Sequence, residues 1–323
     1  MARLAPSVAR VRTAVRTACS TLPEGTVVLV ACSGGPDSMA LAAACAFTAP
    51  RQGLRCGLVT VDHGLQDGSA RRADTVADWA RGAGFDPVEV QRVTVGREGG
   101  PEAAARRSRY AALETVRSQH EAAAVLLGHT RDDQAETVLL ALSRGAGPHG
   151  LSGMPRRRGH LLRPLLELSR ADTEAACREQ GLPVWNDPHN GDDAFARARV
   201  RKAMPLLTER LGEKLVANLA RTAMLVAQDN EALETVATSL LDEASRGDEI
   251  ETSPLMVAPK ALRTRVLRRW LLERGARAED LSSAHIAAVE AMVVAWRGQR
   301  PTQVPGGLSV ARRDDRLAAM STR

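Results

Sequence analysis

Aromatic residues and lysines are both scarce in this chain of 323 residues. It contains one tyrosine, three phenylalanines and four tryptophans, which disfavours binding of unpaired bases on a platform of stacked rings. Of the 44 basic residues, only Lys202, Lys214 and Lys260 are lysines. The net charge of +6 still favours anionic partners, above all nucleic acid, and arginine contacts to phosphate are the expected mode of binding.

The chain also lacks closely spaced cysteines and long apolar runs. No two of its five cysteines have the two-residue spacing that zinc and iron–sulfur sites usually require, so we expect reduced, structural thiols. No run approaches the roughly 18–20 apolar residues of a membrane-spanning helix, and the arginine-rich N-terminus has no apolar segment before a cleavage site. These absences predict a cytoplasmic protein that does not associate with membranes.

The first two-thirds of the chain have the pattern of an α/β domain. Between residues 26 and 143, short apolar runs alternate with longer amphipathic ones, as in a parallel sheet whose strands are joined by crossover helices. A further apolar run at 161–166 predicts an additional strand. Ser169, with Asp172 three residues later, predicts a capping box that opens a helix ending near Gly181.

The pattern changes after residue 215, where the strand signal stops. Apolar side chains then recur at every seventh position, as in one long amphipathic helix: Leu219, Val226, Leu233 and Leu240. Two more helices are expected, at 259–274 and 282–296, followed by a hairpin at 306–320. We therefore predict two domains, an α/β domain at residues 1–212 and a smaller, mainly helical domain at 213–323.

The first polar cluster is SGGPDS, Ser33 to Ser38, between a predicted strand and a predicted helix. Gly35 can cap the helix, Pro36 suits its first position, and the N–H groups of Ser33, Gly34 and Gly35 can form a concavity that binds phosphate. No GxxxxGK[ST] motif occurs in the chain, so a P-loop NTPase is disfavoured. An ordinary Gly-Pro turn explains these six residues equally well.

Two further polar clusters also follow predicted strands. In VDHGL, Asp62 and His63 form a pair that is usually turn chemistry. In GHTRDDQAET, spacings of three and four residues put His129, Asp132 or Asp133, and Glu136 on one helical stripe. The alternative, a capping box of Thr130 and Asp133, accounts for Asp133 and leaves Glu136 unexplained.

All three clusters follow strands that are predicted to be parallel. Ser33, Asp62 and His129 would therefore emerge at the same edge of the sheet, where open α/β sheets bind their ligands. A phosphate-binding concavity beside carboxylates suggests a nucleotide with Mg²⁺. On these residues alone, the sequence predicts a nucleotide enzyme and no more.

SGGPDS, with its strand and helix, resembles the PP-loop of the N-type ATP pyrophosphatases, which split ATP into AMP and pyrophosphate and share an adenine nucleotide α-hydrolase-like fold. Six further segments resemble, in this order, the tRNA(Ile)-lysidine synthase family: VDHGL at 61–65, ARRSRY at 105–110, HTRDDQAET at 129–137, RGAGPHGLSGM at 144–154, LRPLL at 162–166 and WNDPHNGDDAFARARVR at 185–201. The family more often has two histidines where this chain has Gly128-His129-Thr130.

This resemblance implies a reaction. Members of the family use ATP to adenylate the first anticodon cytidine of an isoleucine tRNA with a CAU anticodon, and L-lysine then displaces AMP to give lysidine. Decoding changes from AUG to AUA. The resemblance implies ATP as substrate, Mg²⁺ as cofactor and a C-terminal domain that binds tRNA, and it leaves a homodimer open.

The resemblance also implies roles around the nucleotide. The N–H groups of Ser33 to Gly35 and the Ser38 hydroxyl would hold the phosphates that leave as pyrophosphate, and Asp37 would bind Mg²⁺. Asp62 and His63 would lie near the adenosine. The resemblance implies that Arg106 and Arg109 stabilise phosphate or an oxyanion. Without it, both would be interpreted as solvated arginines on an exposed helix face.

On the lysine side, Asp133 and Glu136 would bind the ammonium group. His129 and Asp132 would serve the lysine carboxylate, the metal or the base. The basic runs at 156–158 and 197–202 would meet tRNA phosphates. The alternatives are a PP-loop tRNA thiolase, a small-molecule amide synthetase and a nucleotide-binding sensor without catalysis.

Overall fold

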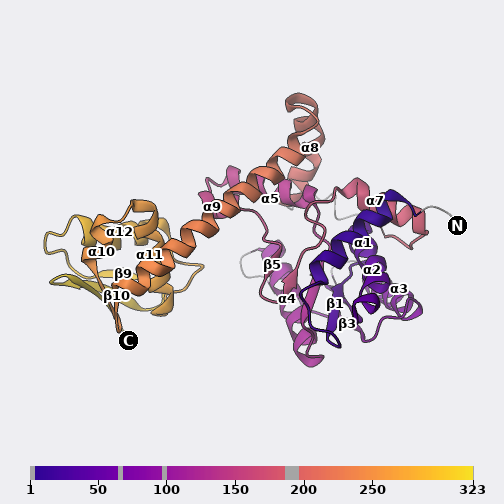
Figure 1. Ribbon diagram of the computed structural model, residues 1–323, viewed down its shortest axis with the longest axis horizontal. Helices are drawn as coiled ribbons and strands as arrows, with labels where there is room; N and C mark the ends of the chain where they lie inside the picture. The colour runs from indigo at the N-terminus through magenta and orange to yellow at the C-terminus, as the bar shows by residue number, and fades with distance from the viewer. Residues whose placement is uncertain (1–3, 65–67, 97–99, 186–195, 323) are drawn as a thin grey trace. The chain divides into compact units, whose positions relative to one another are not determined.

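The computed structural model describes residues 4–64, 68–96, 100–185 and 196–322. The chain separates into two units, Met1–Ala227 and Gln228–Arg323 (Figure 1). The predicted boundary near residue 212 precedes a long helix, whereas the two units divide within that helix. Each unit is described by itself.

A six-stranded sheet lies at the centre of the first unit. Its strands are β1 (Val27–Ala31), β2 (Arg55–Asp62), β3 (Val88–Arg92), β4 (Ala124–Leu127), β5 (Arg157–Arg158) and β6 (Leu161–Leu162). Their order is β3-β2-β1-β4-β6-β5, and every neighbouring pair is parallel except β5 and β6. The predicted parallel α/β sheet is confirmed. Only two residues of the apolar run at 161–166 form a strand; the others are buried in turns.

Helices cover both faces of this sheet (Figure 1). The described helices of this unit are α1 (Pro6–Cys19), α2 (Pro36–Thr48), η1 (Pro50–Gln52), α3 (Ser69–Gly82), α4 (Pro101–Gln119), α5 (Arg131–Ser143), α6 (Pro148–Leu151), α7 (Arg170–Gln180) and α8 (Ala196–Leu211). Successive side chains of β1 point to opposite faces, so Val28 and Val30 pack with α1, α2, α3 and α7, while Val27 and Leu29 pack with α4. Because both faces are buried, β1 is apolar throughout.

The helix α7 begins at the predicted capping box. The backbone N–H of Asp172 donates to Ser169 Oγ at 3.2 Å, and the N–H of Ser169 donates to Asp172 Oδ2 at 2.9 Å. The helix ends at Gly181, which has a φ of +61°. Both predicted ends of this helix are confirmed.

The second unit combines helices with a second sheet. After α9 (Leu215–Ala244), which enters it from the first unit, come β7 (Ser245–Arg246), β8 (Glu249–Glu251), α10 (Thr252–Val257), α11 (Lys260–Glu273), α12 (Ser283–Val294), β9 (Thr302–Val304), β10 (Leu308–Arg313) and β11 (Arg316–Ser321). The long helix, the two later helices and the hairpin are confirmed. The hairpin belongs to an antiparallel sheet of order β7-β8-β11-β10-β9. Its other strands have two or three residues, too few for a visible alternation.

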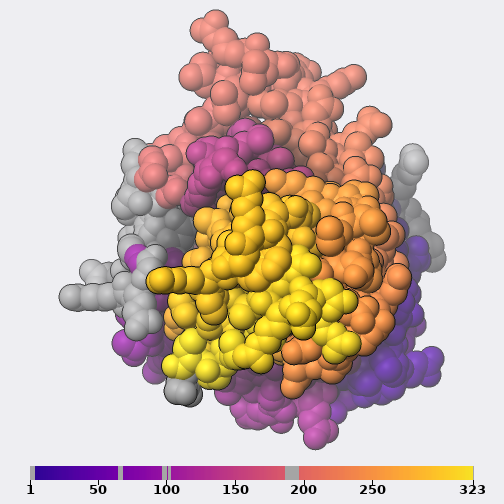
Figure 2. Space-filling view, turned by 90° about the vertical axis from the view of Figure 1, so that its left-hand side faces the viewer, coloured from indigo at the N-terminus to yellow at the C-terminus, as the bar shows by residue number. Residues whose placement is uncertain are grey.

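The second unit has its own core, centred on Trp270, Leu267 and Ile250. Figure 2 shows this unit, coloured orange and yellow, as a rounded body. In α9 the fully buried positions are Ala223, Asn230, Ala237, Leu241 and Ala244, whereas the leucines and the valine of the predicted seven-residue repeat are only half-buried. The repeat therefore predicts the helix and the correct side of it, although the buried positions on that side are other residues, three of them alanines.

Candidate active site at the carboxyl edge of the sheet

The SGGPDS turn joins β1 to α2 and packs closely. Gly34 has a φ of +84°, and a Cβ on it would lie 3.0 Å from Val76 Cγ2, so both the backbone and the space favour glycine. The Ser38 hydroxyl accepts from Ser33 N at 3.2 Å and donates to the Gly35 carbonyl at 3.0 Å. One predicted phosphate donor, the Ser33 N–H, is therefore bonded inside the turn. The first-turn N–H groups of α2 have no acceptor within the helix and face the same edge of the sheet.

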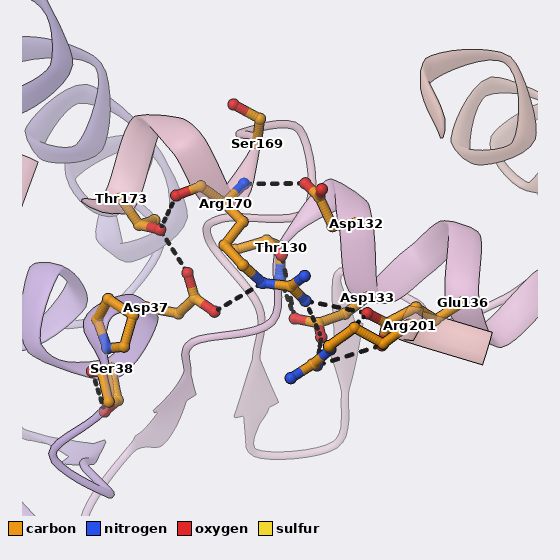
Figure 3. A network of polar contacts seen from close by, with 12 residues as sticks. Asp37, Ser38, Thr130, Asp132, Asp133, Glu136, Ser169, Arg170, Thr173 and Arg201 are labelled. Atoms are coloured by element: carbon orange, nitrogen blue, oxygen red, sulfur yellow. Dashed lines mark hydrogen bonds and ion pairs between the residues drawn. The ribbon is translucent and has the colours of Figure 1, made fainter. Parts of the chain in front are cut away.

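Asp37 lies in the first turn of α2 and points across the sheet edge toward α7 (Figure 3). The Thr173 hydroxyl donates to Asp37 Oδ1, and Arg170 Nε lies 3.9 Å from Asp37 Oδ2. Burial raises the pKa of Asp37 to about 6, although the hydrogen bond from Thr173 acts in the opposite direction. A carboxyl group that titrates so close to neutrality at the end of a parallel sheet is a functional candidate.

The end of β4 lies directly against the start of α2. A Cβ on Gly128 would lie 3.1 Å from the backbone of both Asp37 and Ser38, closer than side chains normally approach. Glycine at this position brings His129 and Thr130 up to the SGGPDS turn. Two of the three predicted clusters therefore meet at one point.

The segment after β4 forms the capping box that the sequence left as an alternative. The Thr130 backbone N–H donates to Asp133 Oδ2 at 2.8 Å, and α5 begins at Arg131. The prediction that His129 shares a helical stripe with the acids is therefore wrong, because His129 precedes the helix. Capping occupies only one oxygen of Asp133 and does not involve Glu136.

Asp133 and Glu136 are buried and face three arginines, two of which, Arg170 and Arg201, are labelled in Figure 3. Glu136 Oε1 accepts from Arg170 Nη2 at 3.0 Å and from Arg201 Nε at 2.9 Å. Arg197 donates from Nε to Glu136 Oε2 at 2.9 Å and from Nη2 to Asp133 Oδ1 at 3.0 Å. Three guanidinium groups thus surround two carboxylates, an excess of one positive charge. We call these five residues the acid–arginine cluster.

The cluster favours the charged forms of Glu136, Arg170 and Arg197. Burial alone would raise the pKa of Glu136, but the hydrogen bond from Arg201 and the charges of Arg201 and Arg197 outweigh it and lower that pKa. Burial would lower the pKa values of Arg170 and Arg197, but the charges of Asp133 and Glu136 outweigh it and raise them. Arg197 and Arg201, which were predicted to meet tRNA phosphates, lie four residues apart on α8 and pair with the carboxylates of α5.

Asp132 lies outside this cluster. Its Oδ2 accepts from the backbone N–H of Arg170 at 2.9 Å, which ties the start of α7 to the start of α5. Because that N–H is one of the unsatisfied donors at a helix N-terminus, Asp132 stabilises α7 from outside. The sequence analysis named Asp132 as a candidate site residue and did not name Arg170. The sequence feature that could have indicated Arg170 is its position directly after the Ser169 cap.

Two histidines lie near Arg109 of α4. Among the described residues, the Nδ1 atoms of His63 and His129 are buried without a hydrogen-bond partner. Burial and then the charge of Arg109 lower the pKa of His63 and, by more, that of His129. Burial also lowers the pKa of Arg109 itself. Both rings are therefore neutral near pH 7, beside a cation.

Comparison with known proteins identifies the family. Residues 9–207 match the family model described as a PP-loop domain, and residues 251–318 match the TilS substrate binding domain. The tRNA(Ile)-lysidine synthase of Salinispora tropica is 58% identical over 327 residues, which cover 99% of this chain and 98% of that protein. That of Thermobifida fusca is 53% identical over 314 residues, which cover 97% of each. The chain belongs to the tRNA(Ile)-lysidine synthase family.

The fold of this family member is also found in a more distant structure. The U34-tRNA thiolase NcsA from Methanococcus maripaludis matches 69% of this chain and 80% of its own, with a TM-score of 0.57 and 16% identity. At this identity the match concerns the fold alone. Membership of the PP-loop family implies ATP as a substrate.

The remaining predicted site residues of this family member are Asp62, which lies in a turn, and Arg106 and Arg109, which lie on α4. Asp62 accepts from the Gly64 N–H at 2.9 Å, the turn contact that its sequence suggests. Burial would raise the pKa of Asp62, but this contact and the charge of Arg92 lower it. Arg106 is exposed, with its guanidinium carbon 4.9 Å from the centre of the Tyr110 ring, whereas Arg109 is half-buried.

The carboxylates near the SGGPDS turn fit Mg²⁺ only in the mode that nucleotide sites use. No group of three or more His, Cys, Asp or Glu side chains in the described parts of the chain could hold a metal ion by itself. Mg²⁺ at nucleotide sites is usually held by one or two carboxylates together with substrate phosphates. Asp37, one carboxylate at a helix N-terminus that suits phosphate, fits this mode.

No helix within the described ranges is long and apolar enough to cross a membrane.

Proposed function

We propose that this chain attaches L-lysine to the first anticodon cytidine of an isoleucine tRNA with a CAU anticodon, using ATP and releasing AMP and pyrophosphate. Membership of the tRNA(Ile)-lysidine synthase family supports the reaction. One structural observation carries its assignment to this site: Arg170 connects Asp37, beside the phosphate-binding turn, with Asp133 and Glu136. The site therefore joins a place for the nucleotide to a charged place for the amino acid.

In the adenylation step, the first turn of α2 and the SGGPDS turn would hold the departing phosphates. Asp37 would hold Mg²⁺, which when bound neutralises the charge of the phosphates. Arg109 would stabilise the oxyanion that develops during attack by the cytosine oxygen, because a half-buried guanidinium acts more strongly than a fully exposed one. His129 and His63, held neutral, would act as hydrogen-bond partners near the nucleotide.

In the second step, the lysine ε-amine must be neutral to attack, so a base in the site has to accept its proton, and His129 and Asp132 are the candidates for that base. We propose that lysine binds at Asp133 and Glu136. Since three guanidinium groups already contact these carboxylates, an incoming ammonium group would replace one of those contacts rather than add to them. The exchange would leave the lysine carboxylate close to the displaced guanidinium.

The thiolase alternative requires reactive thiols at the carboxyl edge of the sheet. Cys45 and Cys56 lie at the opposite edge, at the end of α2 and the start of β2, with their Sγ atoms 2.9 Å apart. Burial raises the pKa values of Cys19 and Cys177 to about 12, and it also raises that of Cys32, beside the SGGPDS turn. Protonated, buried thiols argue against sulfur transfer.

One assay tests the proposal, with ATP, radiolabelled lysine and an isoleucine tRNA carrying a CAU anticodon. Incorporation of lysine into RNA with release of pyrophosphate is expected. A tRNA whose first anticodon base is not cytidine serves as the control. Pyrophosphate release with a small acid or amide and no labelled RNA would favour the small-molecule synthetase instead.

We place this reaction in the cytoplasm, where tRNA, lysine and ATP meet. All residues used in the proposed steps come from one chain, so the assignment holds for a monomer and for a homodimer alike.

A further inference from the structure

A cavity of ≈ 630 Å³ lies in the first unit, away from the acid–arginine cluster. One wall is α1, which contributes alanines and threonines, including Thr13 and Thr17. The opposite wall is the segment from Arg156 to Leu168, which contains β6. None of its lining residues belongs to the SGGPDS turn, to α5 or to α8. Its volume is typical of a ligand site.

Four arginines line this cavity, and two of them are neutralised. Arg10 pairs with Asp172, and Arg156 pairs with Glu167. Arg157 donates from Nε to the Gly159 carbonyl at 3.2 Å and has no acidic partner within the described residues. Two guanidinium charges, those of Arg157 and Arg163, are therefore left for an anion.

Arg163, from the LRPLL motif, is the unusual member of this set. It is 4% exposed, although arginine is rarely buried unless it is paired. Its Nη1 donates to the Pro155 carbonyl at 2.8 Å, while its Nε is buried without a partner among the residues that the structure describes. No salt bridge pairs Arg163 with a carboxylate within the described ranges, so an anion bound in the cavity would supply the counter-charge that a buried cation requires.

The remaining lining indicates which kind of anion. No asparagine, glutamine or aromatic side chain lines the cavity, so it has neither the amides that read base edges nor the rings that stack on bases. It offers guanidinium groups, the threonine hydroxyls of α1 and an apolar floor that includes Leu162 and Pro164. These groups suit phosphate and sugar without regard to sequence.

We infer that this cavity is a docking site for the phosphate backbone of the RNA substrate, with a phosphate held by Arg157 and Arg163. The inference rests on the proposed function for the identity of the RNA. It gives Arg163, the arginine of LRPLL, a role in binding an RNA phosphate. Of the basic run at 156–158, it leaves mainly Arg157 to contact the RNA.

A cysteine footprint tests the site on the full chain. Thr17→Cys places a thiol in the cavity, while the five native cysteines are all buried and should alkylate slowly. The matched control is Thr115→Cys, another exposed helical threonine of the first unit, on α4. We expect the tRNA to slow N-ethylmaleimide labelling at Thr17→Cys several-fold more than at Thr115→Cys.

Two results of this experiment would overturn the inference. Equal protection of both thiols, or of neither, would mean that the cavity is not where the RNA docks. Protection by AMP or inorganic phosphate alone, equal to that by tRNA, would make the cavity a site for small anions.

A second measurement does not depend on the cysteine variants. Arg157→Gln should weaken tRNA binding and reduce the slope of log K against log salt by about 0.7–0.9, the value for one phosphate contact. Arg158→Gln, on the same strand but outside the cavity, should have the smaller effect. Equal effects of the two variants would overturn the inference.

The lysine-transfer assay on the unmodified chain separates this inference from the proposed function. Lysine transfer without protection of Thr17→Cys by tRNA would reject the cavity as an RNA site and leave the proposed function standing. The footprint without lysine transfer would reject the proposed reaction and keep the cavity as an RNA site.

Discussion

Arg170 donates from Nη2 to Glu136 Oε1 at 3.0 Å, and this contact joins the first residue of α7 to the second turn of α5. The two residues are 34 positions apart in the chain. Glu136 is 2% exposed, so its charge is compatible with burial only because the arginines surround it. The following expectations start from this cluster and from the SGGPDS turn beside it.

Removing the buried carboxylate should destabilise the first unit. Glu136→Ala leaves Asp133 as the only carboxylate of the cluster facing three guanidinium groups, of which Arg170 also lies 3.9 Å from Asp37, and loss of one partner of a buried ion pair costs about 3–5 kcal/mol. The measurement is the shift in the midpoint of urea unfolding. Glu114→Ala, which removes an exposed partner of Arg117, should cost less than about 1 kcal/mol. Similar shifts for the two variants would contradict a structural role for Glu136.

Asp37→Ala should abolish adenylation while tRNA binding remains. The variant removes the carboxylate proposed to hold Mg²⁺. The RNA contact proposed above does not involve Asp37. Pyrophosphate release in the presence of tRNA measures the first property, and filter binding measures the second. Normal turnover in this variant would remove Asp37 from the site.

Asp37 should also make activity and stability depend on pH in opposite directions. Its pKa is raised from 3.8 to about 6, so the proposed metal-binding form is lost, and kcat/KM for ATP should fall, as the pH decreases through about 6. For stability the sign is reversed: the folded state binds the proton more tightly, so the stabilisation is full below about pH 4 and is lost as the pH rises through about 6.

A neutral analogue isolates the stability effect. Asp37→Asn should raise the free energy of unfolding at pH 8 by about 1–3 kcal/mol, because it removes a carboxylate that is ionised in a buried place. At pH 4 the difference should be small. Urea unfolding at the two pH values measures it, and the same difference at both would contradict the raised pKa.

Asp133→Asn should raise the KM for lysine more than the KM for ATP. The substituted amide oxygen can still accept the capping hydrogen bond from Thr130, so α5 should keep its start while the cluster loses one negative charge. Asp132→Asn, outside the cluster, is the comparison. An equal increase in both KM values would move Asp133 from the lysine site to the metal or the nucleotide.

Gly128→Ala should impair both stability and adenylation. The added Cβ would lie 3.1 Å from the backbone at Asp37 and Ser38, which must move to accommodate it. We expect a loss of about 1–3 kcal/mol, typical of overpacking, and a lower rate of pyrophosphate release. In Gly82→Ala, on α3, nothing lies within 4 Å of the added atom, and the variant should be close to neutral. Equal behaviour of the two variants would contradict the close approach.

Much of the site could be predicted because it depends on local order in the chain. The strand before Ser33 and the helix after it follow from an apolar run and from Gly35 and Pro36, and parallel strands must bring their carboxyl ends to one edge. The capping residues Thr130 and Ser169 act over three positions, so their partners are visible in the sequence.

The partners of charged side chains were less predictable. Arg197 and Arg201 look like a solvated or phosphate-binding run, and only the packing of α8 against α5 shows that they neutralise Asp133 and Glu136. In the same way, nothing in the letters LRPLL indicates that Arg163 is buried beside a cavity.

The sequence by itself therefore determined the α/β class, the order of its elements, the edge at which the nucleotide site lies and the family. These properties depend on periodicity, caps and motifs within a few residues of one another. The tertiary structure alone decided which charges pair, that His129 precedes the helix rather than joining its stripe, and that Asp37 titrates near neutrality. Those properties depend on burial and on distances of a few ångströms between residues far apart in the chain, such as Arg170 and Glu136, and no local pattern encodes them.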